Sequence, residues 1–182
     1  MNKNRGKQFE DVIRSCFEKI PGVSVDRLHD QTTGYAGSTN ICDMIVYQKP
    51  YEYYFECKSV HGNTLSIHSV PKPDKKGVLH GFYGNISDKQ WEGLLEKSKI
   101  EGVTAGVICW WVDKDITKFI TIQLLQNARE SNCKSVRYDD VLVDARAHQY
   151  SQIIEGHKKR VFFDYDMIDF LHQLEKLQRR RN

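Results

Sequence analysis

Two carboxylates and a lysine stand at a spacing that suits the hydrolysis of phosphodiester bonds. Asp43 precedes Glu56 by thirteen residues, and Lys58 follows Glu56 with one residue between them. Side chains alternate faces along a strand, so Glu56 and Lys58 share a face if this segment is a strand. Close carboxylates resist joint ionisation unless a cation lies between them, and Mg²⁺ takes oxygen ligands of this kind. A nearby lysine can then assist an attacking water, so the pattern indicates metal-assisted hydrolysis.

The apolar neighbours of these charges argue against a simple solvated ion pair. An isolated Glu-x-Lys on a strand is usually an exposed pair of charges that contributes little to stability. Here residues 44–47 and 53–55 are apolar runs typical of buried strands. Charges at the ends of buried strands are costly without partners or a metal. We therefore interpret the three charged residues as a candidate site.

Hydrophobic periodicity predicts the elements that must position these side chains. Residues 5–20 carry apolar side chains at helical spacing, and the helix ends at Pro21-Gly22. Glu10 lies at the edge of that apolar stripe. It is therefore either an ordinary surface residue or a carboxylate that leans over the end of a sheet.

The rest of the chain alternates strands and helices. Ser87 is a helix N-cap, and residues 61–85 are rich in Gly, Pro, Lys and His, which predicts a long basic loop. The final helix, from about Asp164, is expected to turn Ile168, Leu171, Leu174 and Leu177 inward. The remaining predicted elements are strands at 23–29, 41–47, 51–59, 105–112 and 118–123, a loop at 30–40, turns at 48–50 and 156–160, and a helix from 88 to about 101.

This order predicts an α/β sandwich with a mixed central sheet flanked by helices. At 182 residues the chain suits a single domain, residues 1–182, with a core over about 1–125 and a C-terminal helical extension over about 126–182.

Composition favours a globular protein in a reducing compartment. The chain has no apolar run long enough to span a membrane and no N-terminal secretory signal, so we expect a cytoplasmic protein. Its five cysteines never form a C-x-x-C pair and are predicted to be buried free thiols. The net charge of +3 is small, but Lys72, Lys75 and Lys76 form a local basic cluster suited to phosphate contacts.

Two other residue groups could carry chemistry. His61, His68 and His80 lie in one segment, but their spacing matches no zinc pattern, which favours loop or phosphate-contact roles. Trp110 and Trp111 could stack on bases, although at least one is expected in the core because the surrounding strand is apolar.

The combination of Glu10, Asp43 and the Phe55-Glu56-Cys57-Lys58 run resembles the PD-(D/E)-x-K nuclease superfamily, with a restriction-endonuclease-like fold. Within it, the chain is most similar to the RecU-type Holliday-junction resolvases of Gram-positive bacteria and their phages. The other segments that carry this resemblance are Asn4-Arg5-Gly6, Ser38-Thr39, Gln90, residues 134–138 and residues 163–169.

The resemblance implies roles for individual residues. Asp43, Glu56 and the Cys57 carbonyl would ligate Mg²⁺ or Mn²⁺, with Glu10 binding the metal directly or through a water. Lys58 would orient the attacking water. Gln90 would position a water or phosphate, although a helix-surface glutamine without such a role is an equal alternative. Thr39 and the lysine cluster named above would contact DNA.

The resemblance also implies a substrate. The expected activity is cleavage of four-way junctions or other branched DNA by a homodimer, because symmetric cleavage needs two active sites. Those resolvases carry a long stalk before the catalytic aspartate, whereas here the connection covers only about residues 30–40. The junction-reading element is then either shortened or moved to residues 61–85. A restriction- or repair-type duplex endonuclease and a non-catalytic DNA-binding protein remain as alternatives.

Overall fold

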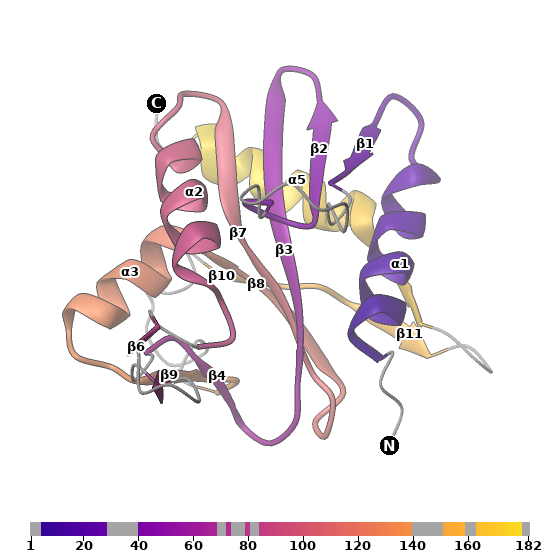
Figure 1. The fold of residues 1–182 in the computed structure, drawn as a ribbon. Helices are drawn as coiled ribbons and strands as arrows, with labels where there is room; N and C mark the ends of the chain where they lie inside the picture. Colours follow the sequence, from indigo (N-terminus) through magenta and orange to yellow (C-terminus); the bar gives the residue numbers. More distant parts are fainter. Residues whose placement is uncertain are drawn as a thin grey trace, which may run out of the picture.

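A computed structural model describes residues 5–28, 40–68, 72–73, 79–80, 84–139, 151–158 and 163–179. A mixed sheet lies at its centre with the strand order β1-β2-β3-β7-β8-β10 (Figure 1). Strands β3 and β7 run parallel, and every other neighbouring pair is antiparallel. The strands are β1 (Ser24–Arg27), β2 (Met44–Gln48), β3 (Tyr51–Val60), β7 (Val103–Trp111), β8 (Ile116–Thr121) and β10 (Ser151–Ile153).

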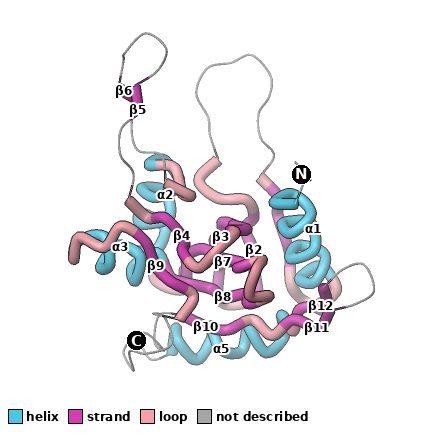
Figure 2. Tube along the Cα trace, turned by 90° about the horizontal axis from the view of Figure 1, so that it is seen from below, coloured by secondary structure: helices cyan, strands magenta, loops and turns pink. Residues whose placement is uncertain are grey.

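Both faces of this sheet are covered (Figures 1 and 2). One face packs against α1 (Arg5–Glu18) and α5 (Met167–Arg179). The other packs against α2 (Asp88–Ser98), α3 (Ile122–Glu130) and a ribbon of β4 (Thr64–Ser66) and β9 (Ser135–Arg137). The predicted class, a mixed central sheet flanked by helices, is confirmed. Two further strand pairs are β5 (Lys72–Pro73) with β6 (Leu79–His80), and β11 (Gly156–Lys158) with β12 (Phe163–Tyr165).

Strand β3 is buried on both faces, as its apolar run predicts. Tyr53 and Phe55 point to the α1 and α5 side, whereas Tyr54 and Val60 point to the α2 side. The Phe55 ring stacks on Phe17 and meets Phe119 and Phe170 at distances of 5.4 to 5.8 Å between ring centroids. This aromatic cluster fixes the middle of β3 between the helices and β8.

Strand β2 ends before β3 does, and this difference creates the position of the candidate site. The two strands pair from Gln48 opposite Tyr51 to Met44 opposite Phe55, and the Asp43 N–H donates to the Phe55 carbonyl at 3.1 Å. From Glu56 onward β3 pairs only with β7. The sequence predicted a strand from residue 41, but residues 41–43 form a bend, because the chain enters the sheet only at Met44.

Several other predicted boundaries were wrong for identifiable reasons. Part of the predicted basic loop at 61–85 is strand β4, which pairs with β9 and whose Leu65 is buried in the core. The strand predicted to reach Gln123 ends at Thr121, whose hydroxyl accepts the Leu124 N–H and caps α3. Residues 156–158, predicted as a turn, form strand β11.

The C-terminal region departs most from the prediction. Residues 126–179 include strands as well as helices, and both β10 and α5 join the main sheet or its core. Helix α5 begins at Met167, so Phe170, Leu171 and Leu174 face inward and Ile168 is 54% exposed, opposite to the prediction for Ile168. The organisation as one domain, with a core and a C-terminal extension that meet near residue 125, stays a prediction. None of the described helices has the length and apolar character to cross a bilayer.

All five cysteines are free, in agreement with the sequence analysis. Cys16, Cys42 and Cys109 are buried as predicted, but Cys57 is only half-buried. Cys133 is exposed because it lies in the turn after α3. Trp111 is fully buried and Trp110 partly so, with its ring 5.6 Å from that of Phe9. At least one tryptophan therefore belongs to the core, as predicted.

We expect Phe55→Ala to lower the free energy of unfolding by about 3–5 kcal/mol, because it removes the ring at the centre of the aromatic cluster. Urea denaturation followed by circular dichroism measures this. Ile168→Ala, at an exposed position, should change stability by no more than about 0.5 kcal/mol. Equal losses in the two variants would contradict the packing described here.

Candidate active site

Glu56 is the central side chain of the candidate site. It is only 1% exposed, on β3 just past the end of β2. Its Oε1 contacts the Lys58 ammonium and accepts a hydrogen bond of 2.6 Å from Gln90 Nε2. Its Oε2 is buried and has no hydrogen-bond partner among the described residues. A buried carboxylate oxygen without a partner is costly, which makes it a position for a cation or a water.

Burial and a second carboxylate shift the titration of this group. The pKa of Glu56 is raised to about 7, mainly by burial and also by the Asp43 charge, while Lys58 and Gln90 oppose the increase. The uncharged form is therefore favoured at an unusually high pH unless a cation is present. A shift of this kind beside a specific charge partner is typical of functional sites.

Asp43 lies at the edge where β2 stops. Its Oδ2 accepts the Cys57 N–H at 2.7 Å, and its carbonyl accepts the Leu28 N–H at 3.0 Å. The Asp43 charge raises the pKa of Glu10 as well as that of Glu56. It is therefore close to both carboxylates, one from each side of the sheet.

Lys58 and Gln90 approach Glu56 from the strand and from α2. Lys58 shares the face of Glu56, as the alternation along β3 predicted, and 23% of its side chain is exposed. Gln90 is the third residue of α2, and its Oε1 accepts the N–H of the N-cap residue Ser87 at 3.0 Å. The capping box thus orients the glutamine amide so that its NH₂ group points at Glu56.

Glu10 reaches the site from α1, on the opposite side of the sheet. Its Oε1 lies 2.9 Å from Arg27 Nε, and only 16% of the side chain is exposed. Burial is the main cause of the raised pKa of Glu10, followed by Asp43. The structure therefore brings Glu10 near Asp43, with its charge shared by an arginine that the sequence analysis did not single out.

The Cys57 backbone faces the open edge of β3. The Phe55 carbonyl accepts the Asp43 N–H on the β2 side, and the Val60 carbonyl accepts the Val112 N–H on the β7 side. Because backbone groups alternate sides along a strand, those of the odd-numbered residues between Phe55 and Val60 face the β2 side. The Cys57 carbonyl therefore faces the same side as its N–H, which binds Asp43. Packing and the nearby carboxylates raise the pKa of the Cys57 thiol, so the thiol stays protonated and is a poor nucleophile.

These oxygen donors suit Mg²⁺ or Mn²⁺. Within the described ranges, no three His, Cys, Asp or Glu side chains converge closely enough to hold a metal by themselves. The available donors are the carboxylates of Asp43 and Glu56 and the Cys57 carbonyl. Magnesium is commonly bound by one or two carboxylates and completes its shell with waters and substrate phosphates. The residues present therefore fit such an ion, and the unpartnered Glu56 oxygen supports this.

Other predicted residues lie outside this cluster or outside the description. Thr39, Lys75 and Lys76 fall outside the described residues, and for Lys72 only the backbone in β5 is described. His61 contacts the Asp113 carboxylate at 2.9 Å, in the turn after β7 rather than at the site. The proposed DNA contacts therefore stay predictions.

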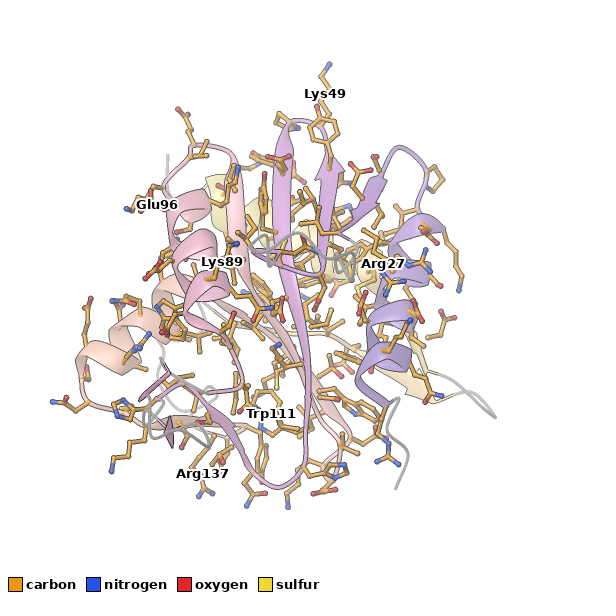
Figure 3. The ribbon with its side chains drawn as sticks, viewed as in Figure 1. Arg27, Lys49, Lys89, Glu96, Trp111 and Arg137 are labelled. Carbon is orange, nitrogen blue, oxygen red and sulfur yellow. The ribbon has the colours of Figure 1, made fainter. Side chains whose placement is uncertain are left out.

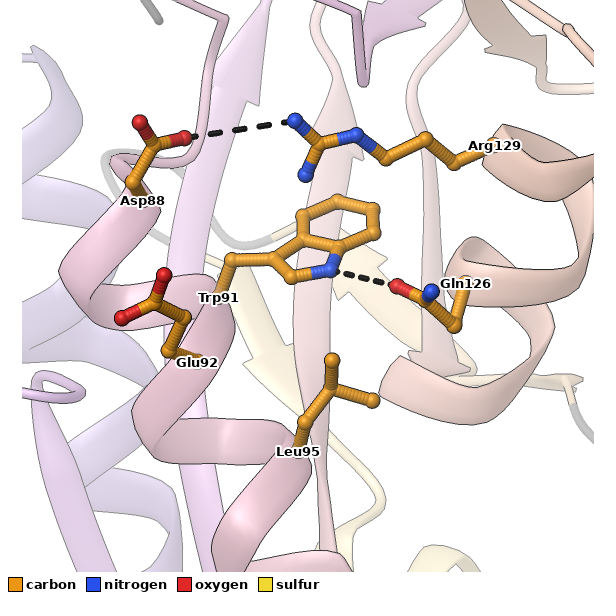
Figure 4. A pocket seen from close by; sticks show the side chains of 6 residues that line it. All are labelled: Asp88, Trp91, Glu92, Leu95, Gln126 and Arg129. Carbon is orange, nitrogen blue, oxygen red and sulfur yellow. Dashed lines mark hydrogen bonds and ion pairs between the residues drawn. The ribbon is translucent and has the colours of Figure 1, made fainter. Parts of the chain in front are cut away.

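A pocket of about 300 Å³ lies between α2 and α3 (Figure 4). The Arg129 guanidinium lies over the Trp91 ring, 4.8 Å from its centroid, and Trp91 Nε1 donates to Gln126 at 2.7 Å. These contacts join the two helices. None of the predicted catalytic residues lines this pocket.

Sequence reasoning missed two charged residues near the sheet. Arg27 ends β1 beside α1 and carries the contact to Glu10 (Figure 3). Lys118 is 1% exposed in β8, where burial lowers its pKa and its Nζ donates to the Tyr138 carbonyl at 2.5 Å. A lysine within an apolar strand was a visible signal, whereas Arg27 could be recognised only once α1 lay against β1.

The chain has matches among solved structures. No family model matches the chain, and no curated protein matches it. Among solved structures it is similar to Hjc, a Holliday junction resolvase from the archaeal hyperthermophile Archaeoglobus fulgidus. The two are 18% identical, with a TM-score of 0.43, over 65% of this chain and 78% of that one.

We expect the raised pKa of Glu56 to make the metal-free protein less stable as the pH rises. The pKa in the folded protein, about 7, exceeds the ordinary value of 4.5. The protonated carboxyl therefore contributes its full stabilisation below pH 4.5, and this stabilisation is lost as the pH rises through 7. Glu56→Gln should therefore gain stability relative to the wild type, by on the order of 3 kcal/mol between pH 4.5 and 8.

Urea denaturation in EDTA across this pH range measures the difference. Glu96→Gln, at an exposed position on α2 (Figure 3), is the matched control and should change stability by no more than about 0.5 kcal/mol. A pH-independent difference between Glu56→Gln and the wild type would show that Glu56 is not perturbed as described.

Proposed function

We propose that this protein is a divalent-metal-dependent endonuclease that cuts phosphodiester bonds in branched DNA. The observation that carries the proposal is the buried Glu56 carboxylate beside Asp43. One of its oxygens is held by Lys58 and Gln90, and the other is left for a cation. A protein without this chemistry has no evident reason to bury these charges together.

The residues take distinct roles in this proposal. Asp43, Glu56 and the Cys57 carbonyl hold Mg²⁺ or Mn²⁺, and Glu10 binds directly or through a water. When bound, the ion polarises the scissile phosphate and lowers the pKa of a coordinated water. Lys58 orients the attacking water and offsets the charge that develops on the phosphate. Gln90 keeps the Glu56 carboxylate turned toward the open edge of β3.

The choice of branched DNA rests on the resemblance of the sequence to RecU-type resolvases. That resemblance also supports a homodimer, since two symmetric cuts need two active sites. The short connection between Leu28 and Asn40 favours a second candidate, a duplex endonuclease of the restriction or repair type, because the stalk of those resolvases has no room there. Both candidate functions use the same catalytic residues and differ only in the DNA substrate, branched or duplex, that binds at the site.

Cleavage of a labelled four-way junction and of linear duplex with the same sequence tests the proposal. We expect paired nicks in the junction with Mg²⁺ or Mn²⁺ and none in EDTA. Asp43→Asn and Lys58→Ala should each reduce the rate by about 10²-fold or more, because each removes charge stabilisation or proton transfer at the phosphate. Glu96→Gln should cut at the wild-type rate.

The outcomes separate the alternatives. Equal cutting of both substrates would favour the duplex endonuclease. Tight junction binding without cleavage in any metal would replace the enzyme with a DNA-binding protein. Full activity in Asp43→Asn would remove this site from the mechanism.

A further inference from the structure

Arg27 lies on the α1 side of the candidate site, beside Glu10, and has no role in the proposed function so far. It is the last residue of β1 and lies opposite Met44, the residue directly after Asp43. Its side chain extends to α1, where Nε is 2.9 Å from Glu10 Oε1 and Nη1 is 3.6 Å from Asp11 Oδ1. Figure 3 shows it beside α1, on the other side of β2 and β3 from α2.

We propose that Arg27 is a positioning residue that holds Glu10 on the side of the sheet where Asp43 lies, so that this carboxylate reaches the shell of the bound metal through a water. This inference rests on the proposed metal-dependent function, and it assigns to Arg27 a part in building the site. The guanidinium acts through Glu10 and does not itself contact the ion or the scissile phosphate.

Glu10 needs such a partner because its surroundings disfavour its charge. The carboxylate is mostly buried and is repelled by Asp43, and Asp11 adds a further like charge. Arg27 is the counter-charge that opposes these effects. Without the contact to Arg27, the Glu10 carboxylate would rotate away from β1 toward solvent, and the site would lose this oxygen donor.

The contact geometry leaves Glu10 able to serve a cation. The described contact uses only Oε1, so Oε2 is available to the ion or to one of its waters. The contact is an ion pair, since Arg27 Nε makes no hydrogen bond among the described residues. Outer-shell partners of ligating carboxylates orient them, and their loss typically costs 10- to 100-fold in metal affinity.

The end of β1 also links Arg27 to Asp43 through the backbone. The next residue, Leu28, donates its N–H to the Asp43 carbonyl at 3.0 Å. The end of β1 thus fixes the backbone of Asp43 through Leu28 and orients the Glu10 carboxylate through Arg27. This arrangement explains how α1, which packs on the opposite face from Gln90, contributes to the same site.

Arg14 provides a matched control. It also lies beside α1 acids, with Asp11 at 3.5 Å and Glu18 at 2.8 Å, and 29% of its side chain is exposed compared with 24% for Arg27. Its contacts do not include Glu10. Loss of Arg14 therefore reports the general effect of removing an arginine from this network.

The test is the affinity of the full chain for Mn²⁺ without DNA, measured by calorimetry and by the electron paramagnetic resonance signal of free Mn²⁺. We expect Arg27→Met to weaken binding by about 10- to 100-fold and Arg14→Met by less than about twofold. In a Glu10→Gln background, Arg27→Met should cause no further loss, because its effect is exerted through that carboxylate. Arg27→Lys should restore part of the affinity. Thermal unfolding confirms that each variant is folded.

Unchanged or tighter Mn²⁺ binding in Arg27→Met would overturn the inference, and so would an equal loss in the Glu10→Gln background. In these cases the proposed nuclease function stands if the wild type binds Mn²⁺ and cuts DNA. Absence of Mn²⁺ binding to the wild type would instead overturn the proposed function together with this inference.

Discussion

The candidate site depends on the hydrogen bond from the Cys57 N–H to the Asp43 carboxylate. This bond exists because β2 begins only at Met44, opposite Phe55, while β3 continues past Phe55. An N–H that a longer β2 would have paired therefore meets a side chain. The same short β2 leaves the Cys57 carbonyl facing an open edge. A side chain, a backbone carbonyl and the buried Glu56 thereby meet at one point without any irregularity in β3 itself.

Burial is the second constraint, and it acts against stability. Glu56 is enclosed by the layer that α2 forms over the sheet, where an ionised carboxylate is unfavourable without compensation. Lys58 and Gln90 compensate one oxygen only. Full satisfaction by protein groups would make this face more stable, but it would leave no position for a cation. Incomplete satisfaction is therefore the feature that makes this carboxylate suitable for chemistry.

The two sides of the sheet contribute differently. The α2 side provides a rigid contact, since the capping box that starts the helix also orients Gln90. The α1 side provides Glu10 through an ion pair with Arg27, in a layer held by Phe9 and Phe17. Asp43 lies at the edge between these layers and influences the pKa of a carboxylate on each. The site thus requires both helical layers, although its central residues come from a single hairpin.

The local sequence pattern by itself was enough to predict the central hairpin and the faces on which its charged residues lie. The apolar runs around Asp43 and Glu56 identified β2 and β3, and strand alternation placed Lys58 beside Glu56 and Cys57 on the other face, because these are properties of one short segment. Ser87 was recognisable as an N-cap for the same reason. Only the tertiary structure decided where β2 ends, that Leu65 and Val136 form a covering ribbon, and that Ile168 faces solvent. It also decided that Arg27 meets Glu10, because pairing between distant segments depends on packing and charge contacts that local periodicity does not contain.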